Sequence, residues 1–202
     1  MAVVTLSRQL GSLGYETAEM LALRTGYRLV GRELINRAAK RAGAPDVALA
    51  MIDELNLLGL KPAPEDVQSY LSAVETVMEE MAAEGNVIIV GRAGQVILAN
   101  WPGVLHLRMI APLAIRVKRL AQRQRISLAA AQAQAETSDR YHKQYFKNFY
   151  HANWDTPEQY DLVMNTAKLT AENAADMICI LLGKKAPASP PSYLPPEPAI
   201  DL

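Results

Sequence analysis

Near the middle of the chain, the residues Asn86-Val-Ile-Ile-Val90 form an apolar run of strand length without polar alternation. Such a run is typical of a strand covered on both faces, as in a parallel sheet between two layers of helices. Further short apolar runs lie at 2–6, 27–30, 104–110 and 160–164, and the segments between them carry apolar residues at helical spacing. Strands that alternate with helices predict right-handed crossovers and a mainly parallel sheet with helices on both faces.

The clearest helix is predicted over 67–81, where apolar residues recur at helical spacing. Ser127 and Thr170 stand where the N-caps of two later helices are expected. Within 43–66, by contrast, prolines and a glycine interrupt any long element, and Pro64 is one of these breaks.

The end of the chain differs in composition from the rest. From Lys184 onward it reads KKAPASPPSYLPPEPAIDL and contains six prolines, which predicts an extended or flexible segment. We therefore expect one folded domain over 1–184, because 202 residues suit a single core, and a Pro-rich flexible tail over 185–202. A protein partner for this tail is an open alternative, since Pro-rich segments bind aromatic-lined grooves.

Composition and charge exclude several classes of protein. The formal net charge is zero, so the whole surface is not expected to attract nucleic acid or an anionic membrane. The single Cys179 excludes an internal disulfide framework, and the three histidines have no ligand spacing, so no metal site is predicted. The start, MAVVTLSRQLGS, lacks the features of a signal peptide, and no apolar run is long enough to span a bilayer. We expect a cytoplasmic protein.

Charge is distributed unevenly along the chain. Nine acidic residues and one lysine lie between Gly43 and Asn86, whereas nine lysines and arginines and two acids lie between Arg108 and Lys147. A basic segment in a neutral protein favours a local anion site. The alternative is that these residues line solvated helix faces.

A glycine-containing turn follows the first predicted strand. The sequence from Ser7 to Gly14 reads SRQLGSLG and precedes a helical pattern. Glycines allow backbone N–H groups to converge on a phosphate, and the helix N-terminus adds a favourable dipole. The full signature G-x-x-x-x-G-K-[ST] is not met, because Gln9 fills the first glycine position and Tyr15 the lysine position. A structural turn without a ligand is the alternative.

Six segments occur in an order that resembles one family: SRQLGSLGYETAEMLA, GRELINRAAKR, NVIIVGRAG, PGVLHLRMIAPLAIRVKRL, SDRYHKQYFKNFY and YDLVMNTAKLTAENAADMI. From about Val3 to Leu182 the chain resembles the cytidylate-kinase-like family, a branch of the nucleoside monophosphate kinases. The resemblance implies a three-layer P-loop-type fold with a five-stranded parallel sheet, a helical NMP-binding insertion over 43–84 and a helical lid over 120–150. It also implies ATP and Mg²⁺ as cofactors and a small acceptor such as CMP.

The resemblance also assigns roles to individual residues. Those placed at the nucleotide phosphates are Gly11, Ser12, Gly14, Tyr15 and, near Mg²⁺, Thr17. Arg8 belongs to the same motif, and its guanidinium could replace the missing lysine by bidentate contact with phosphate.

Three further cations receive roles from the resemblance. Arg92 matches the arginine near the acceptor phosphate, while Arg140 and Lys143 resemble lid cations that neutralise the transferring phosphoryl group. The structural alternatives are an ion pair for Arg92 and ordinary solvated positions for Arg140 and Lys143.

Three departures from the family pattern leave two functions open. Tyr15 replaces a cation, Gly31 stands where relatives usually carry an acid, and Ala93 stands where cytidylate kinases carry Asp. Loss of one cation at a transition-state charge costs a few kcal/mol, or on the order of a hundredfold in rate. The chain is therefore expected to be either a phosphotransferase or a catalytically impaired nucleotide-binding module that acts through a homo-oligomer or a partner.

Overall fold

The structure is a computed structural model, and it describes residues 2–43 and 63–183. The first half of the predicted NMP-binding insertion and the Pro-rich tail therefore lie outside the described residues. The described elements, in chain order, are β1 (Val3–Arg8), α1 (Gly14–Thr25), β2 (Arg28–Val30), α2 (Arg32–Ala42), α4 (Pro64–Glu84), β3 (Val87–Val90), α5 (Gly94–Ile97), β4 (Val104–Ile110), α6 (Leu113–Gln124), α7 (Leu128–Tyr150), β5 (Leu162–Asn165) and α8 (Ala171–Leu181).

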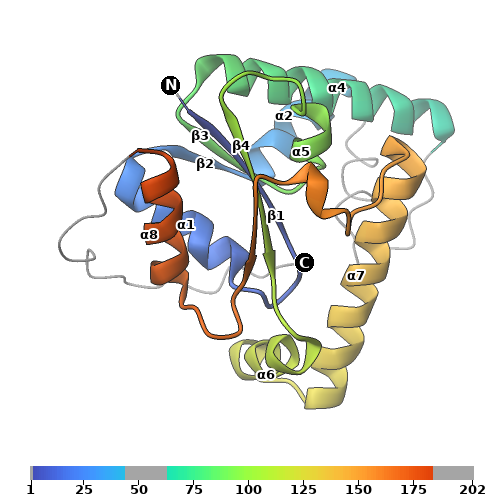
Figure 1. Ribbon diagram of the computed structural model, residues 1–202. Coiled ribbons are helices and arrows are strands. Elements are labelled where there is room, and N and C mark those ends of the chain that lie inside the picture. The colour runs from blue at the N-terminus through green and yellow to red at the C-terminus, as the bar shows by residue number, and fades with distance from the viewer. Residues whose placement is uncertain (1, 44–62, 184–202) are drawn as a thin grey trace.

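The five strands form one sheet in the order β2-β3-β1-β4-β5, and every neighbouring pair is parallel. Helices α1 and α8 cover one face, and α2, α4 and α5 cover the other, while α6 and α7 lie beyond the sheet (Figure 1). The predicted α/β fold, a parallel five-stranded sheet with helices on both faces, is confirmed.

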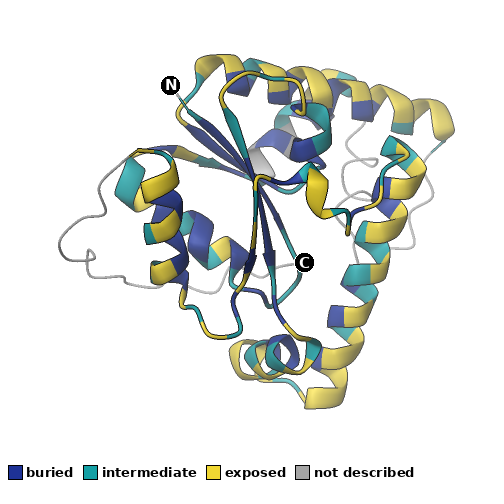
Figure 2. Cartoon of the chain, viewed as in Figure 1, coloured by how far each residue is buried: buried dark blue, intermediate teal, exposed yellow. Residues whose placement is uncertain are grey.

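Each face of the sheet has its own hydrophobic core, because successive side chains of a strand point to opposite faces. Val3 and Ile89 pack with α2 and α4, whereas Val4, Leu6 and Ile88 pack with α1 and α8. Both faces of the central strands are buried in Figure 2, which explains why 86–90 carries no polar alternation.

The ends of several elements differ from the sequence-based expectation. Pro64 does not interrupt a helix but opens α4, since a proline at the first helical position loses no intrahelical hydrogen bond. The last strand begins at Leu162 and not at Tyr160, because the backbone N–H of Tyr160 donates to Pro157 in a short 3₁₀ turn. The predicted N-caps are confirmed: Ser127 Oγ accepts from the N–H of Ala130, and Thr170 Oγ1 from that of Asn173.

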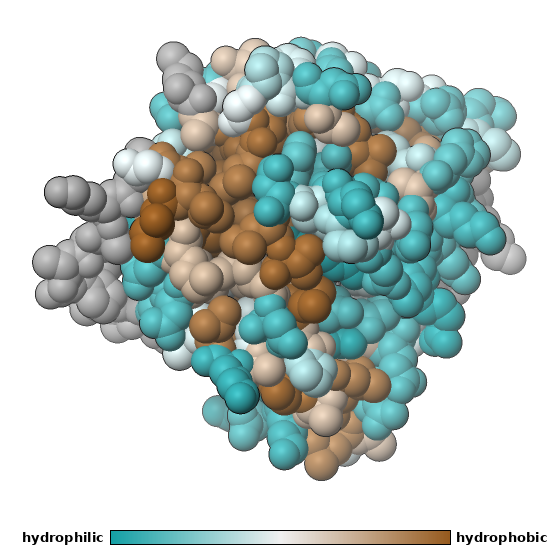
Figure 3. Space-filling model, viewed as in Figure 1, coloured by the Kyte–Doolittle hydropathy of each residue, from teal (hydrophilic) through white to brown (hydrophobic). Residues whose placement is uncertain are grey.

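The surface carries one notable group of apolar side chains. Figure 3 shows brown, hydrophobic surface over the region of α8 and the edge strand β5. Val163, Met177, Ile180 and Leu181 are exposed there. None of the helices in the described residues has the length and apolar character needed to cross a membrane.

Candidate functional site

Side chains around the turn between β1 and α1 hold it in place by hydrogen bonds to its carbonyl oxygens. Each of four successive carbonyls accepts a side-chain hydrogen bond: Leu10 from Arg116 (3.3 Å), Gly11 from Arg119 (3.4 Å), Ser12 from Thr166 (2.8 Å) and Leu13 from Thr17 (2.7 Å). In a trans peptide the N–H group points opposite to the carbonyl before it. The N–H groups of the turn are thereby directed away from these side chains.

Three of these N–H groups have no acceptor in the part of the chain that the structure describes: those of Gly11, Leu13 and Gly14. The fourth, that of Ser12, donates to the carbonyl of Gln9 at 3.1 Å. Gly11 and Leu13 have left-handed backbones, with φ of +81° and +62°, and α1 begins without a side-chain N-cap. Unpaired N–H groups at an uncapped helix N-terminus form an anion-binding concavity.

Ser12 adds an unusual polar group to the turn. Its side chain is fully buried, and its Oγ has no hydrogen-bond partner among the described residues. Since a buried hydroxyl without a partner costs about 1–3 kcal/mol, the described residues do not fully satisfy the polar groups of the turn.

Arg8 ends β1 and lies beside the turn. Its side chain passes between Gly14 and Gly91, and its Nη1 would stand 3.6 Å from a Cβ at Gly91. The same Nη1 donates to Nε2 of His142 on α7 at 3.2 Å. The carboxyl ends of β1 and β3 thus bring a half-buried guanidinium to the edge of the sheet where ligands bind in open α/β folds.

Arg116 connects the turn to α6 and α7. The side chain is buried, its Nε donates to the Ala111 carbonyl at 3.0 Å, and its two terminal nitrogens bind both carboxylate oxygens of Asp139 at 3.2 and 2.7 Å. A bidentate Arg–carboxylate pair fixes geometry as well as charge. The position of the Leu10 carbonyl is therefore tied to the packing of the two helices.

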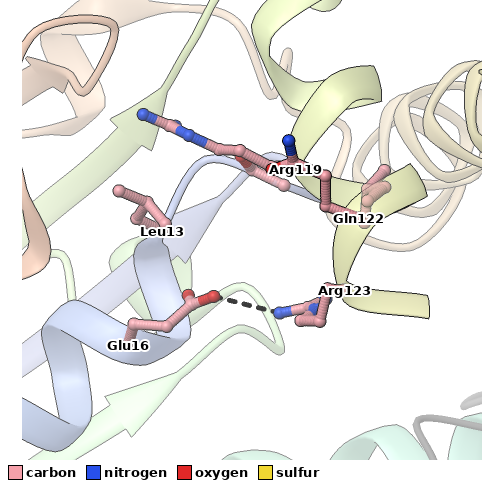
Figure 4. A pocket seen from close by; sticks show the side chains of 7 residues that line it. Leu13, Glu16, Arg119, Gln122 and Arg123 are labelled. Carbon is pink, nitrogen blue, oxygen red and sulfur yellow. Dashed lines mark hydrogen bonds and ion pairs between the residues drawn. The ribbon is translucent and has the colours of Figure 1, made fainter. Parts of the chain in front are cut away.

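A cavity of about 390 Å³ opens beside the turn. It is lined by Gly11, Leu13, Glu16, Arg119, Leu120, Gln122 and Arg123 (Figure 4). Arg123 and Glu16 form an ion pair of 3.0 Å across it. Burial lowers the pKa of Arg119, an effect that Glu16 partly opposes, and the guanidinium stays charged at neutral pH.

A second polar group lies around Arg92, in the turn after β3. Burial raises the pKa of both Tyr70 and Tyr150, and the positive charge of Arg92 opposes the increase at each. The hydroxyl of Tyr70 is buried without a hydrogen-bond partner in the described parts of the chain, and those of Tyr145 and Tyr150 are buried close to each other. The three phenols and Arg92 come from α4, α7 and the β3–α5 turn, and together they offer donors to a polar ligand.

The predicted lid cations differ in their surroundings. Arg140 is exposed, and its Nη2 donates to Thr137 of the same helix. Lys143 forms an ion pair of 2.8 Å with Asp155, whose other carboxylate oxygen accepts from Arg108 at 2.6 Å. Burial alone would raise the pKa of Asp155, but hydrogen bonds from Lys143 and Arg108 outweigh it and lower that pKa.

The structure thus brings Arg8, Gly11, Ser12 and Gly14 together, with Tyr15 half-exposed on the first turn of α1. Thr17 is fully buried, and its hydroxyl donates to Leu13. The sequence analysis missed Arg116, Arg119, Thr166 and His142. The basic segment 108–147 was a signal for the two arginines, but spacing alone could not show which cations bind the turn.

A Mg²⁺ site does not form from the described residues. They contain no cluster of three His, Cys, Asp or Glu side chains, and the hydroxyl of Thr17 already donates to a carbonyl. In kinases Mg²⁺ is commonly held by substrate phosphates with one or two protein ligands and several waters.

Comparison with solved structures supports the fold. The chain is similar to an uncharacterized protein from Eubacterium ventriosum, with a TM-score of 0.70, 20% identity, and coverage of 92% of this chain and 100% of that one. It is also similar to a sugar kinase from Janibacter sp., with a TM-score of 0.55, 17% identity, and coverage of 91% and 95%. The order of the parallel sheet and these neighbours define a P-loop-type α/β fold.

Sequence comparison gives the family. The model of the "Cytidylate kinase-like family" matches residues 3–168. The cytidylate kinase of Ignicoccus hospitalis is 29% identical over 178 residues, which cover 88% of this chain and 97% of that protein. The chain belongs to the cytidylate kinase-like family, a family of nucleotide-binding phosphotransferases.

One relative has a different name and a different length. A uronate isomerase of Corynebacterium glutamicum is 33% identical over 127 residues, which cover 63% of this chain. The chain spans about a quarter of that protein, since the matched region covers 23% of it.

Proposed function

We propose that the protein binds ATP at the β1–α1 turn and transfers its γ-phosphoryl group to a small acceptor, with a nucleoside monophosphate such as CMP as the first candidate. The observation that carries the proposal is the turn itself. Its carbonyls are bound by other side chains, and three of its N–H groups lack an acceptor in the described residues, next to Arg8.

Each part of the site has a distinct task in this proposal. The N–H groups of Gly11, Leu13 and Gly14 bind phosphate oxygens, and Arg8 supplies the positive charge that Tyr15 does not. The cavity beside Arg119 receives the nucleoside end of ATP. A guanidinium over a planar base suits such a pocket. Mg²⁺ would be held mainly by the phosphates of the nucleotide and would lower their negative charge.

The acceptor is proposed to lie against Arg92 and the three tyrosine hydroxyls. A phosphate monoester there would present an anionic oxygen, which attacks the γ-phosphorus while the bond to ADP breaks. No proton has to move in this step, so positioning and charge stabilisation suffice. Arg140 and Lys143 are proposed to approach the transferring group from α7. To reach the transferring group, Lys143 would have to give up its ion pair with Asp155.

Two observations favour alternatives to this function: a module that binds nucleotide without turnover, and a different class of acceptor. The half-exposed Tyr15 at the lysine position, together with Gly31 and Ala93, favours a module that binds nucleotide without turnover. The uronate isomerase relative favours sugar acids as a second class of acceptor, because a related stretch forms part of a protein named for sugar-acid chemistry.

The test is ADP formation by purified protein with ATP and Mg²⁺. The acceptor panel contains the nucleoside monophosphates and a set of hexuronates with their keto isomers. We expect ADP to form with one acceptor class and the Arg8→Ala variant to lose that activity. ATP binding without ADP formation for any acceptor would support the non-catalytic module instead.

A further inference from the structure

His142 on α7 joins the lid helix to the candidate phosphate site. Its Nε2 accepts from Arg8 Nη1 at 3.2 Å, and its Nδ1 lies 2.8 Å from the carbonyl oxygen of Ser138, one turn earlier in the helix. Arg8 ends β1 and His142 follows it by 134 residues, so this contact depends on the tertiary fold.

The partners of the two ring nitrogens determine where the proton of His142 lies. Nδ1 lies 2.8 Å from a carbonyl oxygen, which can only accept, and 3.5 Å from the Ser138 hydroxyl; the shorter contact requires that Nδ1 carries the hydrogen. A guanidinium can only donate, so Nε2 presents its lone pair to Arg8. Both contacts are satisfied by the neutral ring alone. Protonation of Nε2 would place one N–H against another and a second positive charge beside the guanidinium.

The ring of His142 is also fixed in its plane. It stacks on the indole of Trp154, with ring centroids 4.7 Å apart and an interplanar angle of 19°. Trp154 is buried, and its Nε1 donates to Ser7 Oγ at 2.8 Å, one residue before Arg8. The Arg108 guanidinium lies over the indole ring of Trp154, 4.4 Å from its centroid. β1 therefore holds both Arg8 and the platform that orients its partner.

We infer that His142 is a positioning residue for Arg8, whose neutral imidazole holds the guanidinium beside the phosphate turn. The inference rests on the proposed function, because Arg8 is its proposed phosphate ligand. A guanidinium carries five N–H donors, and the contact with His142 uses one of those of Arg8. A fixed guanidinium loses less side-chain entropy when phosphate binds, so affinity rises without a direct contact between His142 and ATP.

The contact predicts a pH dependence that involves several charged groups. Arg8 faces His142 from β1. Two further charged groups, Arg108 of β4 and Asp155, lie beside Trp154, on which the imidazole stacks. On α7 itself, Tyr141 packs edge-on against the imidazole, and Lys143 is bound to Asp155. Arg8 favours the neutral ring, and its removal should make protonation of His142 easier.

Nuclear magnetic resonance of the full chain tests the contact without any nucleotide. The chain has three histidines, so their ring protons can be assigned with His→Gln variants and titrated one by one. We expect Arg8→Ala to raise the titration midpoint of His142 by about one pH unit. The exposed His151 is the internal control and should keep its midpoint. An unchanged His142 midpoint in folded Arg8→Ala would overturn the inference.

Two substitutions separate positioning from simple packing. His142→Phe keeps an aromatic ring on Trp154 but removes the acceptor, and we expect it to weaken ATP binding about tenfold. His142→Gln keeps an acceptor near the Nε2 position and cannot titrate. It should bind ATP within about threefold of wild type at about pH 7.5. Between about pH 7.5 and 5.5 its affinity should fall less than that of wild type, because the titration of ATP itself is common to both proteins.

The outcomes distinguish the inference from the function on which it rests. If the wild type binds ATP and His142→Phe binds it equally well, the positioning role is overturned while the proposed function stands. If the wild type binds no ATP, the proposed function is overturned, and the role of His142 in it falls as well. If His142→Gln fails together with His142→Phe, an acceptor at this position is not sufficient to hold Arg8, which also overturns the inference.

Discussion

Gly14, the first residue of α1, packs directly against the side chain of Arg8, the last residue of β1. A Cβ atom at Gly14 would collide with the Cβ of Arg8 and stand 3.0 Å from its Cγ. The glycine that opens the helix therefore makes room for the side chain of Arg8, the proposed phosphate ligand. The position of the Arg8 side chain therefore depends on the absence of a Cβ at residue 14.

Gly14→Ala should consequently displace Arg8. Overpacking at this contact is expected to cost about 1–3 kcal/mol of unfolding free energy and to weaken ATP binding. Urea unfolding and calorimetric titration measure the two effects. Leu23→Ala, at an exposed position of the same helix, is the control and should stay within about 0.5 kcal/mol of wild type. Wild-type stability and affinity in Gly14→Ala would contradict the packing described.

Asp139→Ala leaves the buried Arg116 without its carboxylate. Breaking such a pair is expected to lower the unfolding free energy by about 3 kcal/mol, because the guanidinium remains buried and uncompensated. Chemical denaturation gives the value. Glu80→Ala removes an exposed pair with Arg41 and should cost less than about 1 kcal/mol. Equal losses in the two variants would argue against a structural role for Arg116 at the turn.

Tyr15→Lys restores a cation at the family's lysine position. Because Tyr15 is half-exposed on the first turn of α1, the new side chain needs no buried space. If charge at the transition state limits turnover, the rate of ADP formation should rise about tenfold or more. Leu23→Lys adds the same charge elsewhere on α1 and should have no effect. A folded Tyr15→Lys protein with an unchanged rate would show that this position does not limit the reaction.

The buried His106 should make the free energy of unfolding depend on pH. Burial lowers the pKa of His106, and the charge of Asp161 opposes this only in part. The unfolded chain, with a histidine pKa of about 6.5, binds the proton more readily. Stability is therefore full above about pH 6.5 and falls as the pH drops toward the lowered pKa of the folded state. Urea midpoints at two pH values measure this. His106→Gln should reduce the difference, and His151→Gln should leave it intact.

The sequence alone was sufficient to predict a parallel sheet covered by helices on both faces. The run at 86–90 is apolar throughout because β3 lies between two other strands with helices on both sides, and this burial is a local signal. Pro64 was misread because a proline breaks a helix interior but begins a helix equally well. Tyr160 looked like strand because an aromatic residue has high strand propensity, yet its hydroxyl binds Gln95 and Trp154 below the sheet.

The site was only partly predictable. Gly11 and Gly14 could be found from their spacing, since the strand–turn–helix pattern is local. The groups that bind the turn come from α6, from Thr166 after β5 and from His142 on α7, which are more than 100 residues away in sequence. A contact of that separation leaves no periodic pattern in a single sequence. The ion pair between Lys143 and Asp155 spans only 12 residues, but it joins α7 to the irregular segment after it, and no spacing rule predicts such a contact.

The most direct test of the account is calorimetric titration of ATP with Mg²⁺ into wild type and Arg8→Ala. A charge-assisted contact between Arg8 and phosphate is expected to contribute about 1.5–3 kcal/mol, so the variant should bind ATP roughly ten- to a hundredfold more weakly. That result would support phosphate binding at the β1–α1 turn. Equal affinity in the two proteins, or no binding by wild type up to millimolar ATP, would contradict it.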